Sequence, residues 1–283
     1  MLKRLQFLTS GESHGKGLLG ILDGLPAGIE ISEEYIDHQL KRRQMGHGRG
    51  GRMKIEKDHA QLWGGVRHGL TLGSPVGILI DNLDWKNWTK KMSVEPIQEK
   101  VKPVTLPRPG HADLAGVHKY GFGDIRNILE RSSARETTMR VALGSVCRKL
   151  LEDVGIYIGS RVVQIHNVKD ESNYKLTPDA MNERADISPV RCLDDNAEKE
   201  MINVIDDAKK AGDSVGGVFE VIATGVPYGL GSYTQWNNKL QARISTMMMS
   251  INAFKGIEIG SGFKSASQFG SNVHDEIGYE NGK

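Results

Sequence analysis

Cysteine is scarce in this chain of 283 residues, which contains only Cys147 and Cys192. Two widely separated cysteines cannot build the disulfide framework of a small secreted domain, and they do not form a Cys-x-x-Cys metal or redox site. The cysteine content therefore favours the reducing environment of the cytoplasm. Cys147 lies on an apolar helical stripe, so we expect it to pack in the core.

Long apolar runs are also missing. No segment approaches the roughly 18 consecutive apolar residues that read as a membrane-spanning helix, and residues 1–10 lack the apolar stretch and cleavage site of a signal peptide. The sequence therefore predicts a cytoplasmic protein without a membrane partner.

A charge excess of either sign is absent, because 37 Lys and Arg residues face 35 Asp and Glu residues. Basic residues nevertheless cluster locally: seven of them lie between Lys41 and Lys57, with Glu56 as the interleaved acid. No aromatic residue accompanies them, which argues against a nucleic-acid groove. A solvated face is one interpretation, and a site for a phosphorylated or carboxylated metabolite is the better one, since arginine grips both groups with two hydrogen bonds.

Glycine, in contrast, is abundant, with 34 residues gathered in short groups between periodic segments. Glycine permits positive φ angles and close backbone approach to a ligand, so several such groups suggest a site built from loops. Tight turns alone would explain any single group.

The hydrophobic pattern predicts an α+β protein that forms a single domain over residues 1–283, because strands and helices are interspersed without strict β-α-β alternation. A helix should begin at the N-cap Ser32 and end near Arg43. The strongest helix should run from about Ser133 to Gly155, with Ser133 and Glu136 as a capping box. Further helices are expected at 197–211 and 240–251, and strands at 5–8, 18–22, 53–55, 62–66, 75–80 and 218–223.

Two loop motifs carry histidines that could act on a ligand. The segment Gly11–Gly15 (GESHG) matches the G-x-S-x-G nucleophile elbow of serine hydrolases, but a strand is expected after it where an elbow requires a helix. The segment Arg108–Asp113 (RPGHAD) places His111 beside a turn, where solvent and ligands can reach it. A lone histidine is more often structural than catalytic, so neither motif decides a function by itself.

A third motif, Arg131–Thr137 (RSSARET), lies at the start of the strongest helix. Unpaired backbone N–H groups, the helix dipole, hydroxyls and two arginines converge there, and such an arrangement binds an anion, typically phosphate. In the structural alternative, Ser133 only caps the helix and Arg135 only pairs with an acid. No metal site is expected, because His47, His59 and His68 lack a recognised ligand spacing.

Together the segments GESHG, Arg42–Lys57 (RRQMGHGRGGRMKIEK), RPGHAD, Glu130–Thr137 (ERSSARET) and Gly212–Gly217 (GDSVGG) resemble the successive signatures of the chorismate synthase family. The resemblance spans nearly the whole chain. It implies an α+β sandwich of antiparallel β-sheets around central helices, and a homotetramer. It also implies a carbon–oxygen lyase that uses reduced FMN to eliminate phosphate from 5-enolpyruvylshikimate 3-phosphate, in the pathway to the aromatic amino acids.

The resemblance further implies roles for individual residues. His14 resembles the acid near the departing phosphate, and His111 resembles the acid that acts towards the reduced flavin. Substrate contacts are implied for Ser13, Arg43, Arg49, Arg108 and Arg135. FMN contacts are implied for Arg131, Ser132, Ser133, Asn252 and Ala253, and an NADPH contact for Arg43 and Arg49.

Family members continue beyond Gly278–Tyr279 with further flavin-contacting and catalytic motifs that this sequence does not contain. An alternative is therefore a catalytically impaired fragment that only binds phosphorylated ligand or flavin. The sequence leaves open whether the chain reduces flavin with NADPH or relies on a separate flavin reductase.

Overall fold

The structure is a computed structural model that describes residues 4–50 and 57–279. The chain divides into two compact units, and the boundary between them in the sequence lies between Tyr228 and Gly229. The strand expected at 53–55 lies outside the described residues.

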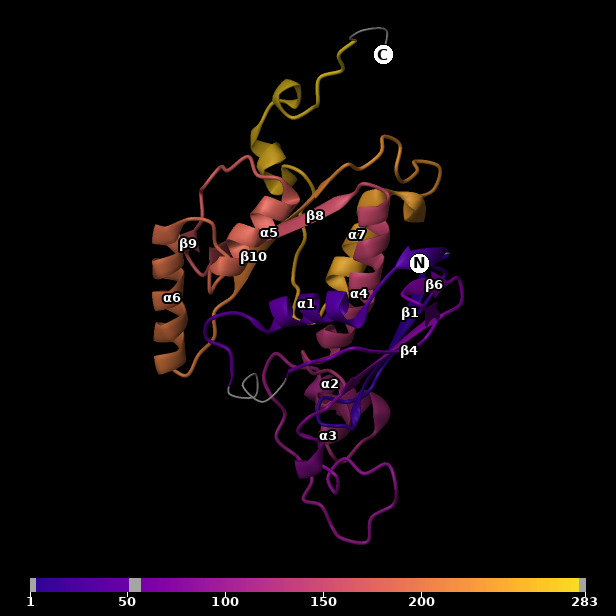
Figure 1. Ribbon diagram of the computed structural model, residues 1–283. Coiled ribbons are helices and arrows are strands. Elements are labelled where there is room, and N and C mark those ends of the chain that lie inside the picture. Colours follow the sequence, from indigo (N-terminus) through magenta and orange to yellow (C-terminus); the bar gives the residue numbers. More distant parts are fainter. Residues whose placement is uncertain (1–3, 51–56, 280–283) are drawn as a thin grey trace. The chain divides into compact units, whose positions relative to one another are not determined.

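The larger unit contains three antiparallel sheets (Figure 1). Their strand orders are β1-β2-β7-β4, β10-β8-β9 and β3-β6-β5. The strands are β1 (Gln6–Ser10), β2 (Gly17–Asp23), β3 (Ala27–Glu30), β4 (Gln61–Gly64), β5 (Val66–Arg67), β6 (Leu70–Leu72), β7 (Val76–Asp81), β8 (Tyr157–Ile165), β9 (Val168–Lys169) and β10 (Gly217–Thr224).

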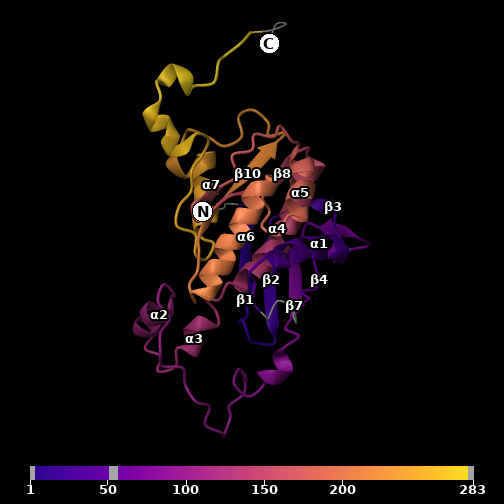
Figure 2. The same ribbon diagram turned by 90° about the vertical axis from the view of Figure 1, so that its left-hand side faces the viewer.

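The helices of this unit cover and separate the sheets (Figure 2). They are α1 (Glu33–Gln44), α2 (Asp113–Tyr120), α3 (Arg126–Leu129), α4 (Glu136–Asp153), α5 (Pro178–Ile187) and α6 (Asp195–Lys210), with the 3-10 turn η2 (Trp85–Asn87). Helix α4 contacts β1, β2, β3 and β7 on one side and β8 on the other, and α5 and α6 pack on β8. Antiparallel sheets with a helix between them confirm the expected fold class.

The core lies where α1 and α4 meet the first sheet. Strand β2 alternates between buried and more exposed residues, and its buried Leu18 and Leu22 pack with Ile36 and Leu40 of α1 and with residues of α4. Gly20 is required for this approach, because a Cβ there would lie 2.4 Å from the sulfur of Met139. Cys147 packs against the same cluster, as expected.

Helix α1 begins and ends close to its predicted boundaries. Its start is fixed by Ser32, whose Oγ accepts a hydrogen bond from the Tyr35 N–H at 3.2 Å. The expected capping box at α4 is wrong. The chain already turns ahead of Glu136, whose N–H donates to the Ser133 carbonyl, and the Glu136 carboxylate accepts from Thr9 and Arg140 instead.

The smaller unit is described from Gly229 to Tyr279 and contains the predicted helix α7 (Leu240–Met249). Its other elements are the 3-10 turns η3 (Trp236–Asn238), η4 (Gly262–Ser267) and η5 (Gly270–Asn272). Asn252 and Ala253 follow α7 in a turn where Ala253 adopts a φ of 69°. Within the described residues, no helix has the length and apolar character needed to cross a membrane.

Candidate active site

The GESHG turn joins β1 to β2 and is tied to the end of α3. The Ser13 N–H donates to the Glu130 carbonyl at 3.0 Å, and the His14 N–H donates to Glu130 Oε2 at 3.0 Å. Gly11 has a φ of 101°, and a Cβ there would lie 2.4 Å from the Gly17 carbonyl oxygen, so the turn requires glycine. Because a strand follows the turn where a nucleophile elbow requires a helix, the serine-hydrolase interpretation is excluded.

His14 lies between a carboxylate and an indole ring. Its Nδ1 is 2.7 Å from Glu130 Oε2, and its ring centroid is 3.8 Å from that of Trp88. Burial raises the pKa of Glu130, but the hydrogen bonds from His14 and the charge of Arg126 more than offset this, and the net pKa is lowered. Glu130 is therefore an ionised, acceptor-only partner for the imidazole at neutral pH.

A buried arginine and a partly buried one approach a buried carboxylate close to this turn. Arg135 Nη2 lies 3.1 Å from Asp58 Oδ1, and Arg43 Nη1 lies 3.9 Å from Asp58 Oδ2. Arg43 also donates to Thr137 Oγ1 and to the Ala134 carbonyl at the start of α4. The end of α1 is thereby joined to the turn between α3 and α4.

The RSSARET turn connects these groups. Ser133 Oγ donates to Ser13 Oγ at 3.2 Å and accepts from the Arg135 N–H at 3.3 Å. Arg131 donates to the carbonyls of Thr9 and Gly11, and Ser132 Oγ donates to the Ile128 carbonyl. One network thus brings together seven of the predicted site residues, which are Ser13, His14, Arg43, Arg131, Ser132, Ser133 and Arg135.

His111 belongs to a second group, at the start of α2. Its Nδ1 lies 2.5 Å from Asp113 Oδ1 and donates to it, and Arg108 donates to His111 Nε2 and to Asp113 Oδ2. Burial raises the pKa of Asp113, whereas hydrogen bonds from Arg108 and His111 lower it, and the net pKa lies below its usual range. Arg108 and His111 are therefore held together by one ionised carboxylate.

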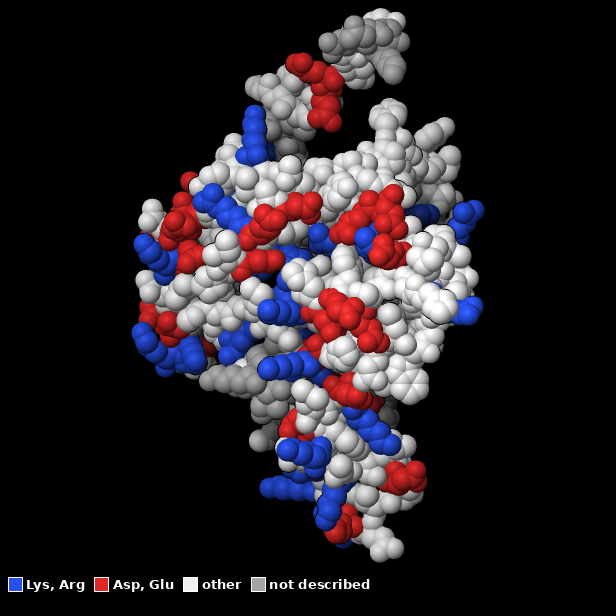
Figure 3. Space-filling view, in the orientation of Figure 1, with Lys and Arg blue, Asp and Glu red and all other residues white. Residues whose placement is uncertain are grey.

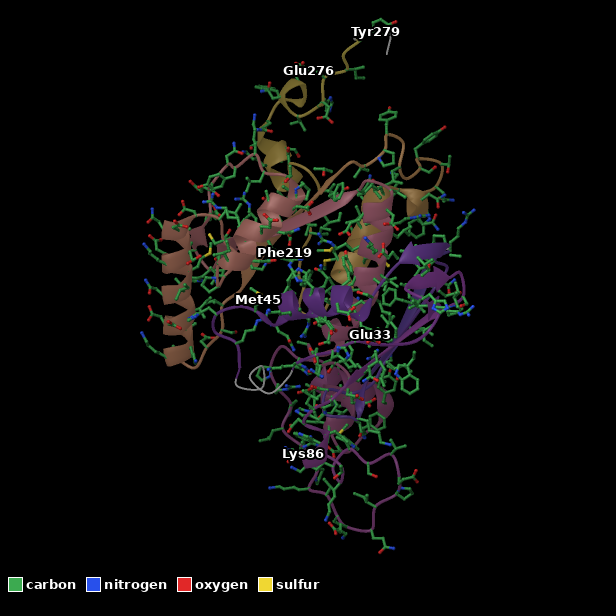
Figure 4. All side chains as sticks on the ribbon, viewed as in Figure 1. Glu33, Met45, Lys86, Phe219, Glu276 and Tyr279 are labelled. Atoms are coloured by element: carbon green, nitrogen blue, oxygen red, sulfur yellow. The ribbon has the colours of Figure 1, made fainter. Side chains whose placement is uncertain are left out.

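Arg49 belongs to a third group, which lines a hollow of about 720 Å³ with residues of α6, β8 and β10. Met45, at the end of α1, leads into this region, and Phe219 of β10 lines it (Figure 4). Neighbouring His47 anchors the loop, because its Nε2 lies 2.7 Å from Asp206 Oδ1 and its N–H donates to the Pro189 carbonyl. Burial lowers the pKa of Arg49. The described structure gives Arg49 different neighbours from His14 and His111.

The surface charge agrees with a local anion site. Lys and Arg are interspersed with Asp and Glu over the face shown in Figure 3, and no broad field of one sign covers it.

Among residues 4–50 and 57–279, no group of His, Cys, Asp or Glu could hold a metal ion.

Comparison with known proteins decides the family. A family model described as chorismate synthase matches residues 5–282. The chain belongs to the chorismate synthase family. The chorismate synthase of Listeria welshimeri is 53% identical over 276 residues, which are 96% of this chain and 71% of that protein. The chorismate synthase of Aquifex aeolicus is 53% identical over 291 residues, which cover 100% of this chain and 73% of that protein.

A solved chorismate synthase structure aligns with this chain with a TM-score of 0.83 and 45% identity, covering 100% of this chain and 77% of the solved one. These similarities make the chain a lyase that forms chorismate, and they do not favour the alternative of a fragment that only binds its ligands. The chain spans 71%, 73% and 77% of the lengths of these three relatives.

Proposed function

We propose that this chain eliminates phosphate from 5-enolpyruvylshikimate 3-phosphate with reduced FMN bound beside the substrate. The observation that carries the proposal is the network that joins His14 to Arg43, to the buried Arg135 and to the N-terminal end of α4. Guanidinium groups, hydroxyls and a helix N-terminus suit a phosphate dianion, and an imidazole at the edge of such a site can protonate a departing phosphate.

Three substrate contacts follow from this arrangement, and we assign Arg43, Arg135 and Ser13 to the phosphate and nearby oxygens. Arg49 and Arg108 lie in the other two groups, and their assignment to the carboxylates rests on the family resemblance. His14 would act as the acid at the departing phosphate. His111, paired with Asp113, would act as the acid towards the flavin. General acid catalysis of this kind contributes about 10²–10⁴ in rate for each group.

We assign flavin contacts to Arg131, Ser132 and Ser133, and the family resemblance adds Asn252 and Ala253. The donor set at the α3–α4 turn fits an anionic cofactor, because two serines and an arginine precede the first turn of an 18-residue helix. Arg131 also donates to the carbonyls of Thr9 and Gly11, and these bonds hold the shape of the turn. When bound, reduced FMN supplies transient electron density that helps phosphate depart.

Several broader features complete the proposal. Residues 1–283 act as one domain of a cytoplasmic homotetramer. NADPH, contacted by Arg43 and Arg49, is a possible reductant, and a separate flavin reductase is the alternative source of electrons.

Anaerobic mixing of reduced FMN, substrate and protein tests the function. We expect chorismate to form together with a transient change in flavin absorbance, because the reduced ring takes part in each turnover. Arg148→Met serves as a control, since Arg148 pairs with Glu152 on α4 away from the network, and it should turn over normally. Binding of both ligands without chorismate formation would show the activity proposed here to be absent.

A further inference from the structure

We propose that Glu130 and Trp88 are positioning residues for His14: Glu130 holds the imidazole proton on Nδ1, and Trp88 holds the plane of the ring. The imidazolium form of His14 then gives its Nε2 proton to a bound ligand, and the neutral ring that remains keeps its proton on Nδ1. The functional part of this inference rests on the acid role proposed above for His14.

Glu130 can fix the position of the His14 proton because its side chain is buried and hydrogen-bonded to His14. Its side chain is 0% exposed, and Oε2 lies 2.7 Å from His14 Nδ1 and 3.0 Å from the His14 backbone nitrogen. An ionised carboxylate can only accept hydrogen bonds, so the proton of this pair belongs on Nδ1. Arg126 Nη1 donates to Glu130 Oε1 at 3.1 Å and provides the countercharge that keeps the buried carboxyl ionised.

Trp88 can fix the plane of the His14 ring because its indole packs against the imidazole. The indole and imidazole centroids are 3.8 Å apart and the rings are inclined by 31°. The indole is itself fixed, because its Nε1–H donates to Asp84 Oδ2 at 2.7 Å. The Arg126 guanidinium lies 5.4 Å from the Trp88 ring centroid, so one arginine contacts both positioning residues.

These contacts act on different degrees of freedom of the same side chain. The hydrogen bond to one ring nitrogen decides which tautomer is present, and the stacked ring restricts rotation about the last side-chain bond. Backbone contacts from Ser13 and His14 to Glu130 would also be expected of a residue that merely anchors the turn. The tautomer of His14 distinguishes the two roles, because anchoring alone does not require a particular tautomer.

Magic-angle-spinning NMR of the whole protein labelled with 15N-histidine measures the tautomer directly. The His14 signals are identified by their loss in His14→Asn, at a pH where the ring is neutral. We expect Nδ1 protonated and Nε2 unprotonated. A wild-type spectrum with the proton on Nε2 would overturn the proposal, and this result does not depend on any variant at Glu130.

Variants then connect the tautomer to turnover. Glu130→Gln should shift the neutral ring towards the Nε2–H form and lower kcat about 100-fold with little change in the substrate KM. The matched control is Glu152→Gln, which removes a carboxylate that accepts from Arg148 and Tyr35, and both the spectrum and kcat should stay unchanged. A loss of kcat in Glu130→Gln with the tautomer intact would contradict the role given to Glu130.

Trp88→Ala should lower kcat about 10-fold without changing the tautomer, and Trp88→Phe should restore most of that loss because it keeps a ring against His14. Equal losses in the two variants would contradict the stacking role. If His14→Asn turns over normally while the wild-type spectrum shows the Nδ1–H form, the acid role of His14 fails and its positioning by Glu130 stands.

Discussion

Asp58→Asn is expected to lower the free energy of unfolding by about 3–5 kcal/mol, because it removes the buried charge that faces the buried Arg135 and the partly buried Arg43. The Asp58 side chain is 1% exposed, and those of Arg135 and Arg43 are 5% and 16% exposed. An amide retains the shape of the carboxylate but removes the negative charge that attracts both guanidinium groups. Urea unfolding of the wild type and the variant measures the difference.

The control for this prediction is Asp207→Asn. Asp207 pairs with Lys210 on the exposed face of α6, where both side chains are about three-quarters exposed (74% and 77%). Removing that pair should change stability by less than about 0.5 kcal/mol. If the two substitutions cost the same, Asp58 does not act as the buried counterion of the arginines.

His111→Ala is expected to lower turnover by about 10²–10⁴-fold while the fold stays intact. The His111 side chain is 23% exposed and contacts Arg108 and Asp113, which remain bonded to each other after the substitution. The loss should therefore appear in kcat and leave the urea midpoint unchanged. Steady-state kinetics with saturating reduced FMN makes the measurement.

His118→Ala is the matched control, since His118 is exposed on the same helix α2. It should retain wild-type turnover. Wild-type rates in His111→Ala itself would remove the second acid from the proposed reaction.

Local sequence patterns were sufficient for much of the fold. The apolar periodicity predicted α4, α6 and α7, and the Ser32 cap predicted the start of α1, because these signals depend on neighbours within one or two turns. Helix α5 was missed although Thr177 and Pro178 supply an N-cap and a first-turn proline. That signal was readable in the sequence.

The motifs also predicted most of the groups in the candidate site, but not how they are supported. Glu130 contacts His14 across 116 positions of the chain, and Trp88 and Asp58 approach their partners only after the sheets and helices pack. No periodicity or spacing encodes such pairs. The failed capping box has the same origin, because Glu136 is engaged by Thr9 of β1, which lies 127 positions away.

A crystal structure of the chain with 5-enolpyruvylshikimate 3-phosphate and FMN bound would show which groups hold the substrate. We expect the substrate phosphate within hydrogen-bond distance of Arg43, Arg135 or Ser13, with His14 Nε2 facing it. A phosphate bound instead in the hollow between Arg49 and α6, with no ligand atom at the His14 network, would contradict it.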